Sequence, residues 1–150
     1  ADPADTSFGI WQPAANKGME VVNDNGALCW TELYTPDVRA ATAFFSTVLG
    51  WTTEETPFTG GTYTIASPAG GGENAGFCGI VPLSADPRAS GAYWLPYFAS
   101  SDPDASRAKA LELGGRALGT ATDIEGIGRI AQLTDPYGAR FAVFKAAVAA

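Results

Sequence analysis

Two segments of the sequence repeat one plan, and this repeat constrains the fold more than any other feature. Each segment opens with strand-like residues, passes a helix start in which Pro and Asp are adjacent, and continues as a helix to a glycine. The two segments are WTELYTPDVRAATAFFSTVLGW (30–51) and LPYFASSDPDASRAKALELGGR (95–116).

Short strand candidates follow each helix and are separated by Gly/Pro-rich turns. They span 51–55, 62–66 and 76–81 after the first helix, and 116–122, 129–134 and 140–146 after the second. The pattern predicts an α+β fold of two βαβββ modules, about 26–82 and 92–146, which form a curved, partly closed mixed sheet around a cleft.

The helix boundaries follow from capping residues and glycines. Thr35 or Asp37 caps the first helix and Gly50 ends it, while the second helix runs from Asp102 to Gly114. Helical spacing predicts one apolar face on each helix. These faces comprise Ala41, Phe44, Phe45 and Val48 on the first helix, and Ala108, Leu111 and Leu113 on the second.

A further match joins the two ends of the sequence. DPADTSFGIW (2–11) aligns with DPYGARFAVF (135–144), an offset of 133 residues. This match predicts that 1–11 is the last strand of a preceding homologous domain outside this sequence, that 12–25 is a linker, and that 26–146 is the domain formed by the two modules. We expect the strand at 8–11 to pack on a sheet, its own or that of another copy, so a homo-oligomer is one arrangement left open.

Composition excludes several classes of protein. The sequence has 9 basic and 16 acidic residues, a formal charge of -7 and no basic stripe, so nucleic acid is not an expected partner. No apolar run reaches the roughly 20 residues that a membrane helix requires, so a membrane is not an expected partner either. Cys29 and Cys78 lie in strand-like segments, which favours reduced thiols and a cytoplasmic protein.

Three motifs resemble one known family. They are the segment 30–51, YWLPYFASSDPDASRAKALELGG (93–115) and GIGRIAQLTDPYGARFAVFK (126–145). Their order and spacing resemble the vicinal oxygen chelate superfamily of glyoxalases, bleomycin-resistance proteins and extradiol dioxygenases. The pattern most resembles the C-terminal domain of actinobacterial two-domain glyoxalase-like proteins, often named hydroxylases. The resemblance implies a glyoxalase-like fold and a second, homologous domain.

The same resemblance locates the positions where metal-dependent members carry His, Glu or Gln ligands. These positions fall at Trp30, within 76–79, at Leu95 and at Ala142, and among them only Cys78 offers a donor. The sequence contains no histidine, the commonest ligand of transition metals in proteins. We therefore expect this domain to hold no metal and no other cofactor.

Strand alternation predicts which side chains face the cleft. The candidate ligand-binding residues are Trp30, Glu32, Tyr63, Leu95, Tyr97 and Arg140. The rings could line an open pocket or fill a closed core. Glu32 and Arg140 could orient a ligand or pair with each other, and Glu32 could act as a general base; no catalytic residue is assigned.

The leading hypothesis is a metal-independent domain that binds an aromatic or polyketide-like small molecule, similar to the bleomycin-resistance branch. The alternative is an enzyme of the superfamily, such as a lyase, isomerase, hydroxylase or dioxygenase, whose catalytic groups lie in the preceding N-terminal domain or in a partner subunit. A third hypothesis is a structural half that stabilises an active N-terminal domain.

Overall fold

The computed structural model describes residues 1–58, 61–72 and 74–147, which form nine strands, two α-helices and one short 3-10 helix. The chain divides into two compact units. The first unit comprises Ala1–Gln12 and Trp30–Trp94, and the second comprises Pro13–Cys29 and Leu95–Ala150. Both units combine a helix with a mixed sheet, so the predicted α+β class is confirmed.

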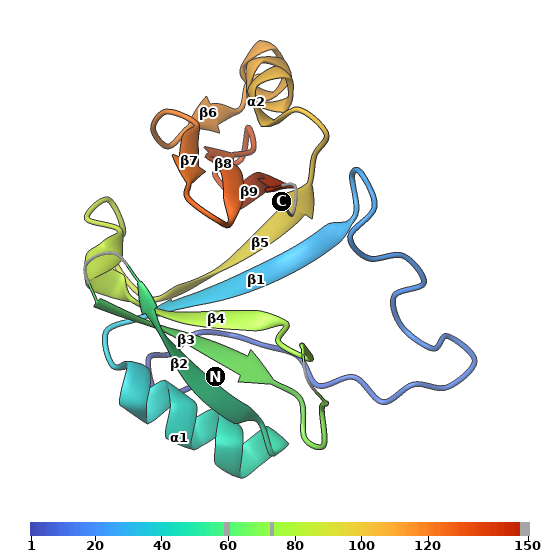
Figure 1. The fold of residues 1–150 in the computed structure, drawn as a ribbon, viewed down its shortest axis with the longest axis vertical. Helices are drawn as coiled ribbons and strands as arrows, with labels where there is room; N and C mark the ends of the chain where they lie inside the picture. Colours follow the sequence, from blue (N-terminus) through green and yellow to red (C-terminus); the bar gives the residue numbers. More distant parts are fainter. Residues whose placement is uncertain (59–60, 73, 148–150) are drawn as a thin grey trace. The chain divides into compact units, whose positions relative to one another are not determined.

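The first unit has the predicted βαβββ order. Its elements are β1 (Leu28–Thr35, of which residues 30–35 belong to this unit), α1 (Val38–Leu49), β2 (Thr52–Phe58), β3 (Gly61–Ser67) and β4 (Cys78–Pro82), followed by the 3-10 helix Leu83–Ala85. The strand order is β2-β3-β4-β1, with β1 parallel to β4 and the other neighbours antiparallel. The helix α1 lies along one face of this sheet (Figure 1).

The sequence left two candidates for the N-cap of α1, and the structure selects Asp37. Its Oδ1 accepts a hydrogen bond from the backbone N–H of Ala40 at 2.9 Å. The helix ends at Gly50, which has a φ of 70°, a conformation that glycine adopts without steric cost.

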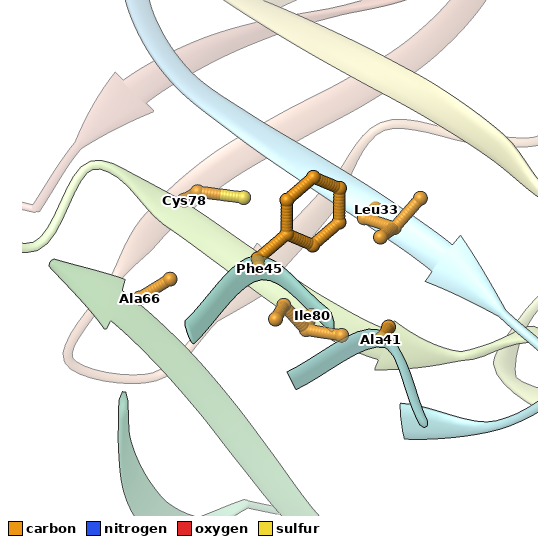
Figure 2. Close-up of a cluster of buried hydrophobic side chains, with 6 residues drawn as sticks. All are labelled: Leu33, Ala41, Phe45, Ala66, Cys78 and Ile80. Atoms are coloured by element: carbon orange, nitrogen blue, oxygen red, sulfur yellow. The ribbon is translucent and has the colours of Figure 1, made fainter. Parts of the chain in front are cut away.

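The core of the first unit forms where α1 meets the sheet. Figure 2 shows the Phe45 ring of α1 among side chains from β1, β3 and β4. The buried members of this cluster are Leu33, Ala41, Phe45, Ala66, Cys78 and Ile80. The prediction for Val48 was wrong, because this side chain is 48% exposed and Leu49 packs on the core instead.

The second unit contains one more strand than predicted. Its elements are β5 (Tyr93–Ala99, of which residues 95–99 belong to this unit), α2 (Pro103–Glu112), β6 (Arg116–Ala117), β7 (Thr122–Ile124), β8 (Gly128–Thr134) and β9 (Arg140–Ala146). The order is β5-β9-β8-β6, with β5 parallel to β9, and β7 also pairs with β8 (Figure 1).

The single strand predicted at 116–122 is therefore two strands. Gly119 has a φ of 119°, which breaks the extended backbone between them. As a result β6 pairs with one end of β8 and β7 with the other. Arg129 on β8 contacts Asp123 on β7 at 2.7 Å and Asp104 on α2 at 2.6 Å.

The predicted apolar face of α2 was also wrong. Ala108, Leu111 and Leu113 are exposed, whereas Pro103 is buried and Ala110 packs on the core of the second unit. The buried members of that core are Ala131, Leu133 and Val143. The small residues Pro103 and Ala110 make the contact of α2 with this core, so the large apolar side chains of the helix were a misleading signal.

The strand predicted at residues 8–11 is not present. These residues form no strand, and Ile10 and Trp11 are exposed. Phe8 instead packs edge-on against Phe45 at 5.3 Å between ring centroids. A strand requires hydrogen-bonded neighbours, and no described residue supplies them to this segment.

The turn before this segment nevertheless repeats the turn before β9. In each turn the Asp Oδ1 accepts from the backbone N–H groups two and four residues later, and the fourth residue has a positive φ. In each, the Asp backbone N–H donates to the carbonyl four residues later, and the Asp carbonyl accepts from the N–H three residues later. The two turns are Asp2 to Thr6 and Asp135 to Ala139. The sequence match thus has a structural counterpart, while the preceding domain stays a prediction.

The predicted linker is irregular throughout. Residues 13–25 form no helix or strand and are exposed. At its end the Asn25 side-chain oxygen accepts a hydrogen bond from Ser101 N at 2.7 Å, and Gly26 N donates to Ala99 O at 2.8 Å. The linker is thereby attached to the second unit.

Two further expectations concern the cysteines and the membrane. Cys29 and Cys78 are both free thiols, the second of them buried. No helix in the described part of the chain has the length and apolar character needed to cross a membrane.

Replacing Phe45 with Ala should lower the free energy of unfolding by about 3–5 kcal/mol, because the ring is only 1% exposed and its loss leaves a cavity. The control is Val48→Ala on the same helix, which should change it by less than about 0.5 kcal/mol. Urea unfolding of the two variants beside the parent measures both effects. Equal losses would show that the core is not centred on Phe45.

Candidate functional site

Strand alternation divides the first sheet into two faces. Leu33 and Ile80 are register partners that face α1, so Glu32 and Gly79, also partners, face the opposite side. Tyr63 and Ile65 on β3 share that opposite face, because Ile65 is paired with Gly79. The predicted residues Trp30, Glu32 and Tyr63 are therefore brought to one surface.

Hydrogen bonds join these three side chains. The Trp30 Nε1–H donates to the Tyr63 hydroxyl at 2.9 Å, and that hydroxyl donates to Glu32 Oε1 at 2.7 Å. Glu32 is only 8% exposed, whereas Trp30 and Tyr63 are half-buried. A buried carboxylate is costly unless it accepts hydrogen bonds, so Tyr63 stabilises Glu32 in this position.

Gly79 makes this arrangement sterically possible. A Cβ built at Gly79 would collide with the Tyr63 hydroxyl and would lie 3.2 Å from Cγ of Glu32. The hydroxyl thus occupies the space that any other residue at position 79 would fill. This role of Gly79 was not predicted from the sequence, although a glycine inside a strand is a signal of close approach.

The electrostatic setting keeps Tyr63 protonated. Burial, and then the neighbouring charge and hydrogen bond of Glu32, raise the pKa of the Tyr63 phenol well above its ordinary value of about 10. On the other face of the sheet, burial raises the pKa of the Cys78 thiol to about 12. Tyr63 can therefore take part in hydrogen bonds but is not suited to act as a base.

A fourth ring extends the surface. The Phe58 ring on β2 lies 6.0 Å from that of Tyr63, between ring centroids. We call Trp30, Glu32, Phe58 and Tyr63 the Tyr63 site. Phe58 was not predicted as a site residue, because the strand predicted at 51–55 ended before it, whereas β2 extends to residue 58.

A second polar cluster in the same unit was also missed. Tyr34 and Tyr93 stack at 4.8 Å with nearly parallel rings. The Tyr93 hydroxyl donates to Asp86 at 2.8 Å, and Arg88 donates to the same carboxylate at 3.1 Å. Asp86 lies in a connection with no periodic pattern, so its burial had no signal in the sequence.

The remaining predicted site residues lie in the second unit. Leu95 and Tyr97 are buried on β5, and Tyr97 is the register partner of Ala142 on β9. Arg140 lies two residues before Ala142, so these side chains share the face of the sheet opposite α2. Whether they contribute to ligand binding stays a prediction.

The residues present do not fit a metal centre. In the resembling family the metal ligands fall at Trp30, within 76–79, at Leu95 and at Ala142, and among these positions only Cys78 offers a donor. The Cys78 side chain packs in the apolar core with Phe45, on the face of the sheet opposite Glu32. The Glu32 carboxylate is held by Tyr63. In residues 1–58, 61–72 and 74–147, no group of three or more His, Cys, Asp or Glu side chains could hold a metal ion.

Comparison with protein families and with curated proteins gives consistent results. The family model described as a glyoxalase-like domain matches residues 30–144. "Putative glyoxylase CFP32" of Mycobacterium tuberculosis is 37% identical over 146 residues, which cover 97% of this chain and 54% of that protein. "Anthracycline biosynthesis protein DnrV" of Streptomyces peucetius is 33% identical over 147 residues, 95% of this chain and 50% of that protein. The chain spans about half the length of these relatives.

Solved structures share the fold. The Mn(II)-bound glyoxalase from Novosphingobium aromaticivorans superposes with a TM-score of 0.56 at 20% identity, covering 81% of this chain and 39% of that chain. At this identity the likeness shows the fold alone, and it confirms the predicted glyoxalase-like architecture.

The unfolding free energy should fall more steeply with alkaline pH in the parent than in Tyr63→Phe. Because the folded state raises the pKa of Tyr63, it retains the proton when the unfolded state loses it above about pH 10, so stability decreases as pH rises. The difference in slope should approach about 1.4 kcal/mol per pH unit. Urea unfolding between about pH 9 and 11 measures it.

The control for this experiment is Tyr137→Phe, which removes a tyrosine that is 96% exposed and should leave the parent slope unchanged. The pKa of the Cys78 thiol is also raised, so this thiol also lowers the unfolding free energy as pH rises. Its contribution is the same in the parent and in both variants. Parallel curves of unfolding free energy against pH for the parent and Tyr63→Phe would show that Tyr63 ionises as freely as an exposed tyrosine.

Proposed function

Because the chain belongs to the family of glyoxalase-like domains, we propose that it is a domain that binds a small aromatic or polyketide-like molecule without a metal ion. The Tyr63 site is the proposed place of binding. In this function the domain sequesters or presents its ligand, as the resemblance to the bleomycin-resistance branch implies.

One observation carries the proposal, the hydrogen-bonded series from Trp30 through Tyr63 to Glu32. Small-molecule sites combine apolar and aromatic area, which supplies affinity, with a few fixed polar groups, which orient the ligand. Trp30 and Phe58 provide partly exposed rings, and Tyr63 provides a hydroxyl whose position is fixed by two partners. A core that only filled space would not need this polar series.

The names of the relatives support an aromatic ligand. Two relatives that are 32–33% identical to this chain are named as anthracycline biosynthesis proteins. Anthracyclines are polycyclic aromatic compounds, and flat rings are the shape that exposed Trp and Phe side chains bind well. The ligand of this chain belongs, on this proposal, to the same broad chemical class.

A second function is favoured by the length of the relatives. The matched region is about half of each relative, and the turn Asp2 to Thr6 repeats the turn before β9. These observations support a preceding homologous domain, as in the two-domain glyoxalase-like proteins. In this alternative the catalytic groups of a lyase, hydroxylase or dioxygenase lie in that domain, and the present chain completes the protein.

Replacing Trp30 with Ala should weaken the binding of 2-naphthol by about tenfold or more, because the indole contributes ring contact and holds Tyr63. Its cost in unfolding free energy should stay below about 3 kcal/mol, since the side chain is only half-buried. Isothermal titration calorimetry and urea unfolding measure the two effects.

The matched control is Trp11→Ala, which removes an exposed tryptophan outside the site and should change neither quantity. A large loss of stability in Trp30→Ala with unchanged affinity for 2-naphthol would identify Trp30 as a core residue and would contradict the proposed function.

Metal analysis tests the metal-independent function of this chain. The 150-residue chain should retain no stoichiometric transition metal after dialysis, because its donor set does not fit one. Inductively coupled plasma mass spectrometry of the dialysed protein is the measurement, with bovine carbonic anhydrase as a positive control. One equivalent of zinc, manganese or iron retained by this chain would contradict the metal-independent function.

A further inference from the structure

Asn25 and Gly26, at the end of the linker, form a chemically reactive pair. The backbone nitrogen of a glycine can attack the side-chain amide of a preceding asparagine, because glycine has no side chain to hinder the approach. The other asparagines of the sequence are Asn16, Asn23 and Asn74, which precede Lys, Asp and Ala. Asn25 and Gly26 are both exposed, so water reaches the pair.

The reaction of such a pair is a deamidation in two steps, with water as the co-reactant. In the first step Gly26 N bonds to Cγ of Asn25, the Cγ–Nδ2 bond breaks, and ammonia leaves with the proton of the Gly26 N–H. In the second step water breaks the bond between Gly26 N and either carbonyl carbon of the resulting succinimide. Opening at Cγ gives aspartate, and opening at the main-chain carbon gives isoaspartate. Neither step oxidises or reduces the chain.

Backbone pairing with the end of β5 holds the attacking nitrogen. Gly26 N donates to Ala99 O at 2.8 Å, and Ala99 N donates to Ala27 O at 2.9 Å. The turn itself is closed by Ala27 N, which donates to Asp24 O at 2.8 Å, and Gly26 has a φ of 87°. The Gly26 N–H is therefore committed to Ala99, and its nitrogen attacks Asn25 only after this bond opens.

The amide that would be attacked is held as well. The Asn25 Oδ1 accepts a hydrogen bond from Ser101 N at 2.7 Å, in the connection between β5 and α2. The attacking and the attacked group are thus each bound to residues 99–101 rather than to each other. A slow modification of a segment held in this way follows the fraction of molecules in which the segment is open.

We propose that Asn25 is a site of deamidation in this protein, and that the hydrogen bonds to Ala99 and Ser101 limit its rate. The reaction proceeds in molecules in which the turn 24–27 has detached from these residues. Its products carry a new negative charge, and the isoaspartyl product also has one more backbone carbon where the linker joins β1. The inference does not depend on the proposed binding function.

The test follows deamidation of the 150-residue chain in mildly alkaline buffer, folded and unfolded in guanidinium chloride. Peptide mapping by mass spectrometry measures the aspartyl and isoaspartyl products at each asparagine. Asn25 should react about tenfold or more slowly in the folded chain, because at least two hydrogen bonds must open first. Asn16 is the internal control. It lies in the irregular part of the linker and should react at the same rate in both states.

Gly26→Ala tests the chemistry of the site. Measured in guanidinium chloride, where backbone strain at a positive φ has no effect, it should slow the reaction of Asn25 by about tenfold or more, because a Cβ hinders the attack. An unchanged rate in this variant would overturn the assignment of Gly26 N as the attacking group. Equal rates at Asn25 in the folded and unfolded parent would overturn the role of the hydrogen bonds. Absence of product at Asn25 in the folded parent, over the period in which Asn16 reacts, would overturn the site itself.

Discussion

The packing of α1 on its sheet is the interaction on which the rest of the first unit depends. Phe45 is buried among apolar side chains of β1, β3 and β4, and this contact fixes which face of each strand is apolar. Because side chains alternate, placing Leu33 against Phe45 places Glu32 on the opposite face. A slip of one residue in β1 would bring the Glu32 carboxylate into the apolar core, so the register is strongly specified. The position of the Tyr63 site is thus a consequence of hydrophobic packing on the other side of the sheet.

A buried carboxylate in a chain without histidine must be satisfied by other groups, and three side-chain choices do this together. Tyr63 donates to Glu32, Trp30 donates to Tyr63, and Gly79 provides the space for the hydroxyl. Each choice is effective only when the others are present, since a larger residue at position 79 would displace the phenol. Such a network is costly in a core that only requires packing, because apolar residues of equal volume would avoid the desolvation of Glu32. This cost, and the half-buried rings beside the network, are the grounds on which we propose recognition of a ligand.

The sequence predicted the features that depend on local pattern. The βαβββ order of the first unit, the helix starts at Thr35 or Asp37 and at Asp102, and the face shared by Trp30, Glu32 and Tyr63 follow from periodicity and capping chemistry. The errors concern features that depend on non-local packing. Val48 and Leu111 are apolar and correctly spaced, yet the sheet does not reach them. The role of Gly79 depends on where a side chain from another strand ends, and the burial of Asp86 depends on Tyr93 and Arg88, which no spacing rule connects to it.

The two Asp-Pro turns show which parts of the structure are determined by the local sequence and which depend on neighbouring strands. Both turns close with the same side-chain and backbone hydrogen bonds, so the residues of each corner specify its shape without help from the rest of the fold. The segments after the two corners differ. Residues 140–146 form β9 because β5 and β8 offer hydrogen bonds on both sides, whereas residues 8–11 have no such neighbours in the described part of the chain and attach through Phe8. The same corner leads into β9 and into no strand at residues 8–11, so the neighbouring strands, and not the corner, decide whether a strand forms.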